Sequence, residues 1–396
     1  MITIRKTKEE LNQLKNDLGV NKLWSFSSIS TYLTSPYEYF LKYIKHEKPD
    51  ADANIYGIMG GLIHDTIEAY YNKEIKFDEM SKRFDDFWNI NIDLLKIKFD
   101  RNNEELNAKI KVKYYECLKQ FMLNHKTIDD KMLTEQFIVI KLGDYYFQGY
   151  IDSLTQNKDG VFTVIDWKSS SIYKKADIPE KSIQLLLYSL GLYQKANGKI
   201  PLDKIKACWN FLKYINVTVK QVNGKEKVRT IERNKVGEKL QSNAKTWLKK
   251  SQMLNDKTIE DYLNQLLLDN SIECLPEDVK NKFSINDCYV YVDVNDYVLK
   301  EIYSLLINTI KEIEEKTREY ELTNDESIFF DTEESIKKQE YYFFNLCDYT
   351  ANKHKPFKKY LEMLDREKNG DEFSQVHYTS TTEEKSDNSW MSGLFG

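Results

Sequence analysis

Two acidic residues and a lysine stand close together in the middle of the chain: Asp152, Asp166 and Lys168. Because side chains alternate along a strand, Asp166 and Lys168 would share one side of a strand, while Trp167 faces the other. Two adjacent carboxylates repel each other, and a divalent cation such as Mg²⁺, which prefers oxygen ligands, relieves that repulsion. A lysine beside such a cation can orient an attacking water or neutralise charge that develops on a phosphate.

The elements that must position these side chains are two runs of aromatic and β-branched residues. The runs 145–154 and 161–167 flank a polar turn, 156–160, and therefore predict a β-hairpin that delivers one acid on each strand. A solvated edge strand without any catalytic role is the alternative interpretation, because an Asp-x-Lys sequence alone is common and carries little information.

Further residues around the hairpin favour the catalytic interpretation. In chain order they are Gly60-x-x-x-His64, Glu135, Gly149-x-x-Asp152, Asp166-x-Lys168 and Gln184-x-x-x-Tyr188. In this order and spacing, across residues 25–215, the chain resembles the PD-(D/E)xK nuclease superfamily. More narrowly it resembles the RecB-type branch, which includes the nuclease domains of bacterial helicase–nucleases and the CRISPR-adaptation exonucleases. Each part alone would be a weak signal, whereas five parts in order are a strong one.

The resemblance implies a metal site that binds Mg²⁺ or Mn²⁺ through four ligands: His64, Asp152, Asp166 and the backbone carbonyl of Trp167. Lys168 would position or activate the attacking water. Without the resemblance, His64 on its helix would be interpreted as a hydrogen-bonded core residue, which is the commoner role of a lone histidine.

The resemblance also assigns roles to three residues outside the metal site. Gln184 and Tyr188 lie one helical turn apart on the same face and would orient the scissile strand. Glu135 would be an accessory acid near the site. The alternatives are a core or boundary position for Tyr188 and an ordinary strand-surface position for Glu135.

The RecB-type branch often holds an iron–sulfur cluster, whose first cysteine directly precedes a proline. Here Ser35 precedes Pro36, and the comparable C-terminal stretch, 341–349, contains only Cys347. Four thiolates cannot be assembled from these positions, so we expect no iron–sulfur cluster. We expect the many aromatic residues to tie the two ends of the domain together by packing.

A basic segment follows the predicted core. Residues 204–250 carry thirteen basic and three acidic side chains, with a turn at Asn223-Gly224 between polar strands and a helix through Trp247. Neutralising phosphates supplies affinity for DNA that is independent of base sequence. We expect DNA to be contacted by Lys220, Lys225, Lys227, Arg229, Arg233 and Lys235. A lysine-rich solvated face is the alternative.

Hydrophobic periodicity predicts the remaining elements. Helices are expected within 57–71, 77–124, 179–196 and 257–322, and strands at 136–142, 205–216 and 288–292. From residue 365 onward the chain is acidic and rich in serine and threonine, which is typical of disorder. It ends with an apolar tip that contains Trp390, Leu394 and Phe395, and this tip is a candidate docking peptide for a protein partner. A tail that folds back is the alternative.

The composition limits the classes of protein to which the chain can belong. The chain has 396 residues, 41% of them hydrophobic and 31% charged, and a net charge of −5, so any DNA-binding surface must be local. No apolar run approaches the length of about 20 residues that spans a bilayer, and the N-terminus lacks the features of a signal peptide. We therefore expect a cytoplasmic protein without membrane contact. We also expect the protein to be encoded by a bacterium or a phage.

Together with the predicted elements, the resemblance implies an α/β fold: a restriction-endonuclease-like core with a mixed central sheet of about four or five strands, flanked by helices, with helical additions at both ends. We divide the chain into an N-terminal arm (1–24), a helical part carrying His64 (25–130), the nuclease core (131–215), a basic hairpin and helix (216–275), a C-terminal helical part (276–364) and a disordered tail (365–396).

The predicted function is metal-dependent hydrolysis of DNA, exonuclease-like, in recombination, replication or repair. The alternatives are a structure-specific endonuclease and a non-catalytic DNA- or protein-binding scaffold that retains the fold. The presence of Asp152, Asp166 and Lys168 together argues against the scaffold.

Overall fold

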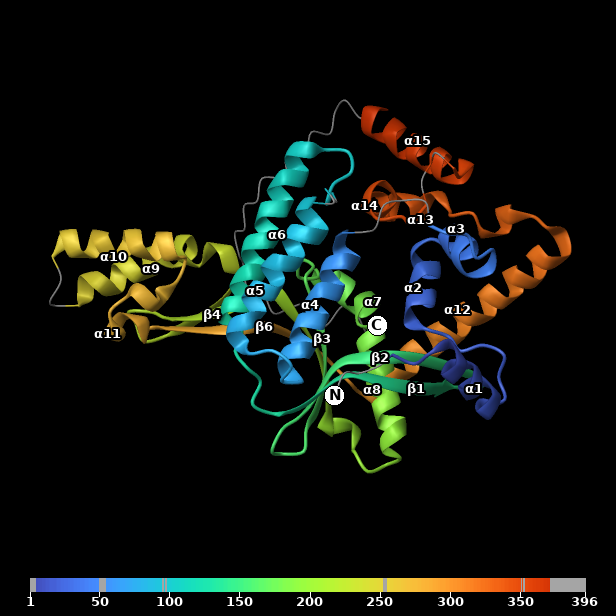
Figure 1. Cartoon of the computed structure of the whole chain (residues 1–396), viewed down its shortest axis with the longest axis horizontal. Helices are drawn as coiled ribbons and strands as arrows, with labels where there is room; N and C mark the ends of the chain where they lie inside the picture. The colour runs from blue at the N-terminus through green and yellow to red at the C-terminus, as the bar shows by residue number, and fades with distance from the viewer. Residues whose placement is uncertain are drawn as a thin grey trace.

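A six-stranded mixed sheet forms the centre of the computed structural model, which describes residues 5–49, 55–94, 96, 98–251, 255–349, 351 and 353–370 (Figure 1). The strands are β1 (Lys131–Leu142), β2 (Tyr145–Gln156), β3 (Phe162–Lys168), β4 (Ile205–Lys220), β5 (Glu226–Glu232) and β6 (Phe283–Val292). The predicted α/β fold with a mixed sheet flanked by helices is confirmed. The sheet has more strands than predicted because both β5 and β6 pair with the long strand β4.

The predicted hairpin of β2 and β3 is confirmed, with Ser153 opposite Ile165 and Gln156 opposite Phe162. β1 pairs antiparallel with β2, whereas β3 and β4 run parallel. A parallel pair needs a crossover connection, and here a helix provides it. The predicted turn at Asn223-Gly224 is also confirmed: Gly224 has φ +81°, a conformation that glycine adopts without a steric penalty.

The helices surround this sheet. In chain order they are α1 (Lys8–Leu18), α2 (Phe26–Thr34), α3 (Pro36–Tyr39), α4 (Ile55–Tyr71), α5 (Phe77–Trp88), α6 (Glu104–Asn124), α7 (Ile178–Lys181), α8 (Ile183–Ala196), α9 (Val236–Lys250), α10 (Asp256–Asp269), α11 (Glu277–Lys280), α12 (Asp296–Thr323), α13 (Glu333–Lys338), α14 (Glu340–Asn345) and α15 (Lys355–Gly370). The helix predicted at 179–196 is interrupted at Ser182, whose hydroxyl donates to the carbonyl of Pro179 at 2.9 Å. No helix among the described residues is long and apolar enough to cross a membrane.

Helices cover both faces of the sheet. On one face α8 and α12 pack against it in a core that includes Phe147, Leu185 and Leu306. On the other face α4, α5 and α6 stand together, as Figure 1 shows, and enclose a second core that includes Phe121 and Trp167. Burial of these apolar surfaces supplies the main stabilisation of the layers.

The basic segment forms an extension at one end of the sheet, on the left in Figure 1. There the far half of β4 and strand β5 pack against α9 and α10 around a third apolar core, which includes Val217, Leu240 and Leu263. The helix predicted through Trp247 is confirmed as α9.

Segments near the two ends of the chain lie together. Tyr37 of α3 packs against Phe357 of α15 with ring centroids 5.2 Å apart, as expected from the aromatic content of both segments. α15 continues to Gly370, so the predicted start of the tail at residue 365 is too early. Its apolar residues Tyr360 and Leu364 are anchored in the core, and the helix continues beyond them. The predicted docking tip lies outside the described residues.

Candidate active site

The candidate site lies where β2 and β3 separate. Their ladder ends at the pair Ser153 and Ile165, and the next residues beyond this pair are Asp152 and Asp166. Each strand therefore places one acid at the same fork. Ile165 and Trp167 enter the core under α4–α6, which leaves Asp166 and Lys168 on the opposite side of β3, as the alternation of the strand predicts.

His64 on α4 completes a cluster with the two acids. One ligand atom each from His64, Asp152 and Asp166 lies within 4.8 Å of the others. His64 Nε2 lies 3.1 Å from the carbonyl oxygen of Trp167, and its Nδ1 lies 3.6 Å from Asp152 Oδ1. His64 therefore presents one ring nitrogen to the Trp167 carbonyl and the other to Asp152, and its tautomer decides which nitrogen is free to bind a cation.

Lys168 forms an ion pair with one of the acids, its Nζ 2.8 Å from Asp166 Oδ2. Burial lowers the pKa of Lys168, but the interactions with Asp166, Tyr173 and Asp152 together outweigh burial and raise it above its ordinary value. For Asp152 burial and the neighbouring Asp166 carboxylate both raise the pKa well above the usual range, although Lys168 opposes them. The single lysine therefore does not fully compensate the two carboxylates.

This donor set fits a hard divalent cation. Asp152 is 16% exposed, and its raised pKa reflects first its burial and then the cost of holding its negative charge next to Asp166. A cation between the carboxylates would offset that cost, and two carboxylate oxygens with one imidazole nitrogen are ligands that Mg²⁺ and Mn²⁺ accept. The carbonyl of Trp167 lies beside His64 and is available as a further oxygen donor.

α8 places Gln184 and Tyr188 beside the fork. Gln184 Nε2 donates to the hydroxyl of Tyr188 at 3.5 Å. Burial raises the pKa of Tyr188 to about 12, and the charges of Asp152 and Asp166 add to this effect. The ring approaches β2 at Gly149 so closely that a Cβ there would lie 2.6 Å from its hydroxyl oxygen. Gly149 is thus required for this approach.

Glu135 lies at the same level of the sheet, on β1. Thr134 pairs with Ser153 and Gln136 pairs with Ile151 in the same register, so Glu135 lies opposite Asp152 at a position where the ladder is interrupted. Glu135 adopts φ +47°. It is buried and lines a narrow crevice together with His64 and Asp152. Burial raises its pKa, and Arg5 opposes this shift.

Two residues near Glu135 were missed by sequence reasoning. Glu68 lines the same crevice one helical turn after His64, and the i, i+4 spacing on α4 was a usable signal for it. Arg5 forms an ion pair with Glu135 at 3.4 Å. No local pattern predicts this contact, because 130 residues separate the two partners.

The predicted DNA-binding residues differ in burial and form three groups. Lys220, Lys225 and Lys227 are exposed on the β4–β5 hairpin, and Arg229 and Lys235 are partly buried. Arg233 is a correction: it is 4% exposed, forms an ion pair with Asp287 at 2.5 Å and donates to the carbonyl of Leu212 at 2.8 Å. Its guanidinium belongs to the interior and is removed from the DNA-binding set.

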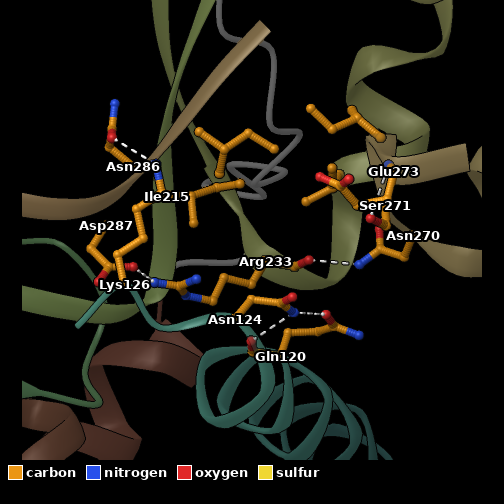
Figure 2. A pocket seen from close by; sticks show the side chains of 13 residues that line it. Gln120, Asn124, Lys126, Ile215, Arg233, Asn270, Ser271, Glu273, Asn286 and Asp287 are labelled. Atoms are coloured by element: carbon orange, nitrogen blue, oxygen red, sulfur yellow. Dashed lines mark hydrogen bonds and ion pairs between the residues drawn. The ribbon is translucent and has the colours of Figure 1, made fainter. Parts of the chain in front are cut away.

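Figure 2 shows the surroundings of Arg233, at a cavity of about 180 Å³ between α6, β6 and the loop after α10. Asp287 also binds His125 Nδ1 at 2.8 Å, and the amide of Asn270 donates to the carbonyl of Arg233 at 2.7 Å. This network joins the basic extension to the core. It shares no residue with the cluster of His64, Asp152 and Asp166.

Ser35 and Cys347, which the sequence resemblance compares with cluster cysteines, are connected through Glu38. Ser35 donates to Asp331 at 2.9 Å and accepts from the backbone of Glu38 at 3.2 Å. The carboxyl of Glu38 binds the hydroxyl of Tyr342 and interacts with Cys347. The expected absence of an iron–sulfur cluster remains a prediction.

The sheet, the fork and the order of the motif residues agree with one known family. A model of the PD-(D/E)XK nuclease superfamily matches residues 23–271, more than half of the chain. The chain therefore belongs to the PD-(D/E)XK nuclease superfamily, a membership that implies hydrolysis of phosphodiester bonds. No curated protein matches the chain significantly.

Proposed function

We propose that this protein is a Mg²⁺- or Mn²⁺-dependent deoxyribonuclease. The observation that carries the proposal is the convergence of His64, Asp152 and Asp166, with Lys168 ion-paired to Asp166 at the same fork. The exposed lysines of the β4–β5 hairpin support DNA as the substrate, because they add phosphate affinity that does not depend on base sequence.

Each residue has a distinct task in this proposal. His64, Asp152, Asp166 and the Trp167 carbonyl would hold the ion, which when bound polarises a phosphoryl oxygen and lowers the pKa of a bound water. Lys168 places its ammonium group beside the attacking water and the charge that develops on the phosphate. Gln184 and Tyr188 orient the scissile strand, and Glu135 is an accessory acid.

Within the superfamily we assign the chain to the RecB-type branch, without the iron–sulfur cluster. The support is the position of His64 on α4 ahead of the sheet, the Gln184–Tyr188 pair on α8, and Ser35 in the place of the first cysteine. An exonuclease role in recombination, replication or repair, in a bacterial or phage context, is part of the same proposal. The tip with Trp390, Leu394 and Phe395 would dock a protein partner.

Cleavage assays test this proposal. Linear DNA should be degraded with Mg²⁺ or Mn²⁺, and Asp166→Ala and Lys168→Ala should each lower the rate at least a hundredfold. A covalently closed circle of the same sequence separates the two modes of cleavage: an exonuclease leaves it intact and an endonuclease opens it. Unchanged cleavage in both variants would contradict the site, and DNA binding without cleavage by the wild type would favour the scaffold.

A further inference from the structure

A cavity of about 710 Å³ opens beside the candidate active site. His64, Trp167 and Lys168 form part of its wall, so it is continuous with the metal-binding cluster. The rest of the wall comes from α4, α6 and the middle of β4, from residues 169–173 after β3, and from α14 and the residue that follows it. Its volume lies in the range of pockets that hold a small organic molecule, which corresponds to about one or two nucleotides of a single strand.

Lys213 of β4 lies in this wall and is unusual among the buried cations. It is 1% exposed, and its Nζ lies 3.7 Å from the ring centroid of Tyr114. Within the described part of the chain, no carboxylate forms an ion pair with it. By contrast, Lys113 in the same wall pairs with Glu232, and buried Arg233 pairs with Asp287.

A buried ammonium group without an anion costs stability, so its presence requires an explanation. Burial and the nearby charge of Lys113 lower the pKa of Lys213 to about 7. An aromatic face compensates only part of the lost hydration. The charge of Glu232 opposes this shift but forms its ion pair with Lys113, so among the described residues no anion is in direct contact with the ammonium group of Lys213. The cavity beside it leads to the place where a phosphate would be hydrolysed.

We propose that Lys213 binds a backbone phosphate of a single DNA strand, next to the phosphate at the cluster of His64, Asp152 and Asp166. Tyr173, which also lines the cavity and is partly exposed, offers a ring surface for a base or sugar, a feature typical of sites for single-stranded nucleic acid. This inference rests on the proposed function, since it assumes a nucleic-acid substrate.

Metal-free binding of a fluorescein-labelled single-stranded oligonucleotide, measured by anisotropy over a range of salt concentrations, tests this role. Lys213→Met should weaken binding about tenfold and reduce the slope of log affinity against log salt by about 0.7, the value for one phosphate contact on a single strand. Lys206→Met is the matched control, because Lys206 is exposed on the same strand and does not line the cavity. It should bind like the wild type.

Two further variants separate charge from packing. Lys213→Arg keeps the positive charge and should bind within about threefold of the wild type. Lys213→Gln should behave like Lys213→Met, and it serves as the charge-free variant if the methionine variant does not fold. Unchanged affinity and slope in a folded charge-free variant, or equal loss in the arginine variant, would overturn the inference.

Failure of the Lys213 phosphate site can be distinguished from failure of the proposed nuclease function, because the binding assay involves no metal and no cleavage. A protein that cuts DNA but whose affinity is insensitive to Lys213 contradicts this inference alone. A protein that never cuts DNA, but whose binding responds to Lys213 as described, contradicts the proposed nuclease and supports the phosphate site.

Discussion

Asp152 and Asp166 lie close together because the β2–β3 ladder ends one residue before them, at Ser153 and Ile165. The separation of the strands exposes both carboxylates to the same space, and Lys168 reaches back to Asp166 from the end of β3. The side chain of His64 is held in position by its contact with the carbonyl of Trp167. The site thus depends on backbone geometry as much as on the acids themselves.

Gly149→Ala tests this dependence at a single residue. The added Cβ would lie 2.6 Å from the Tyr188 hydroxyl oxygen and 2.7 Å from the nearest ring carbon, so the ring must move away from the fork. We expect the cleavage rate to fall at least tenfold, because a displacement of about 1 Å near the reacting groups is costly. Steady-state cleavage and the melting temperature would be measured together.

Two controls accompany this variant. Gly57→Ala introduces the same atom on α4 where nothing lies within 4 Å, and it should leave the rate unchanged. In the background Tyr188→Ala, the additional change Gly149→Ala should have little further effect, because the clash partner is gone. A wild-type rate in the Gly149→Ala single variant would contradict the assigned position of Tyr188.

At the scale of elements, the basic extension contains both surface and interior cations. Arg229 on β5 is partly buried, with a contact of 3.5 Å to Asn243, whereas Arg233 is held between Asp287 and the carbonyl of Leu212. The two arginines are four residues apart, so composition alone could not separate their roles.

Alanine substitutions should distinguish the structural role of Arg233 from the DNA-binding role of Arg229. Arg233→Ala removes the arginine partner of Asp287 and leaves, among the described residues, its contact with His125, so it should lower the free energy of unfolding by about 3–5 kcal/mol. Arg229→Ala should change stability by less than about 1 kcal/mol and instead weaken DNA binding and flatten its salt dependence. Chemical denaturation and DNA titration of both variants provide the measurements. The opposite assignment of the two effects would contradict the structure.

Charge reversal tests the surface part of the same extension. The triple variant Lys220→Glu, Lys225→Glu and Lys227→Glu should weaken DNA binding at least tenfold at low salt, because each change removes a positive charge and adds repulsion. Affinity measured at several salt concentrations checks this expectation. If affinity and salt slope match the wild type, the hairpin is an ordinary solvated face.

The contact between the two chain ends should depend on pH. Burial raises the pKa of Asp331 to about 7, although the hydrogen bond from Ser35 opposes the shift. The unfolded carboxyl titrates near 4, so between about pH 4 and pH 7 the folded state binds more protons than the unfolded state. This contribution to stability is present below pH 4 and is lost as the pH rises through 7.

The corresponding measurement is the free energy of unfolding at pH 5 and pH 8. The Asp331 contribution should favour pH 5 by an amount of the order of a few kcal/mol, and Asp331→Asn should remove that difference. The control variant Asp261→Asn, on the exposed surface of α10, should keep the difference in stability between pH 5 and pH 8. An Asp331→Asn profile parallel to that of the wild type would show that this carboxyl does not titrate as proposed.

For the whole molecule, local patterns predicted the elements better than the contacts between them. Alternating and helical periodicity identified the β2–β3 hairpin and helices α4 and α9, whereas the mixed sheet was predicted from the resemblance to the nuclease superfamily. The polar first half of β6 carries Ser284 and Asn286, so only its second half was predicted as a strand. Its pairing with β4 depends on a partner about 70 residues away, which no local pattern contains.

The same distinction applies to the site. The order of the motif residues predicted that His64, Asp152, Asp166 and Lys168 belong together, and the structure places the first three within one cluster. The buried state of Arg233 was not predictable, because its partner Asp287 lies 54 residues later. The ion pair of Arg5 with Glu135 was missed for the same reason.

The central claim is that His64, Asp152 and Asp166 hold a divalent cation. Anomalous difference maps from Mn²⁺-soaked crystals, collected at the manganese absorption edge, test it most directly. The account predicts one strong peak bounded by these three side chains in the wild type and its loss in Asp166→Asn. A peak elsewhere with none at the fork, or an unchanged peak in Asp166→Asn, would contradict it.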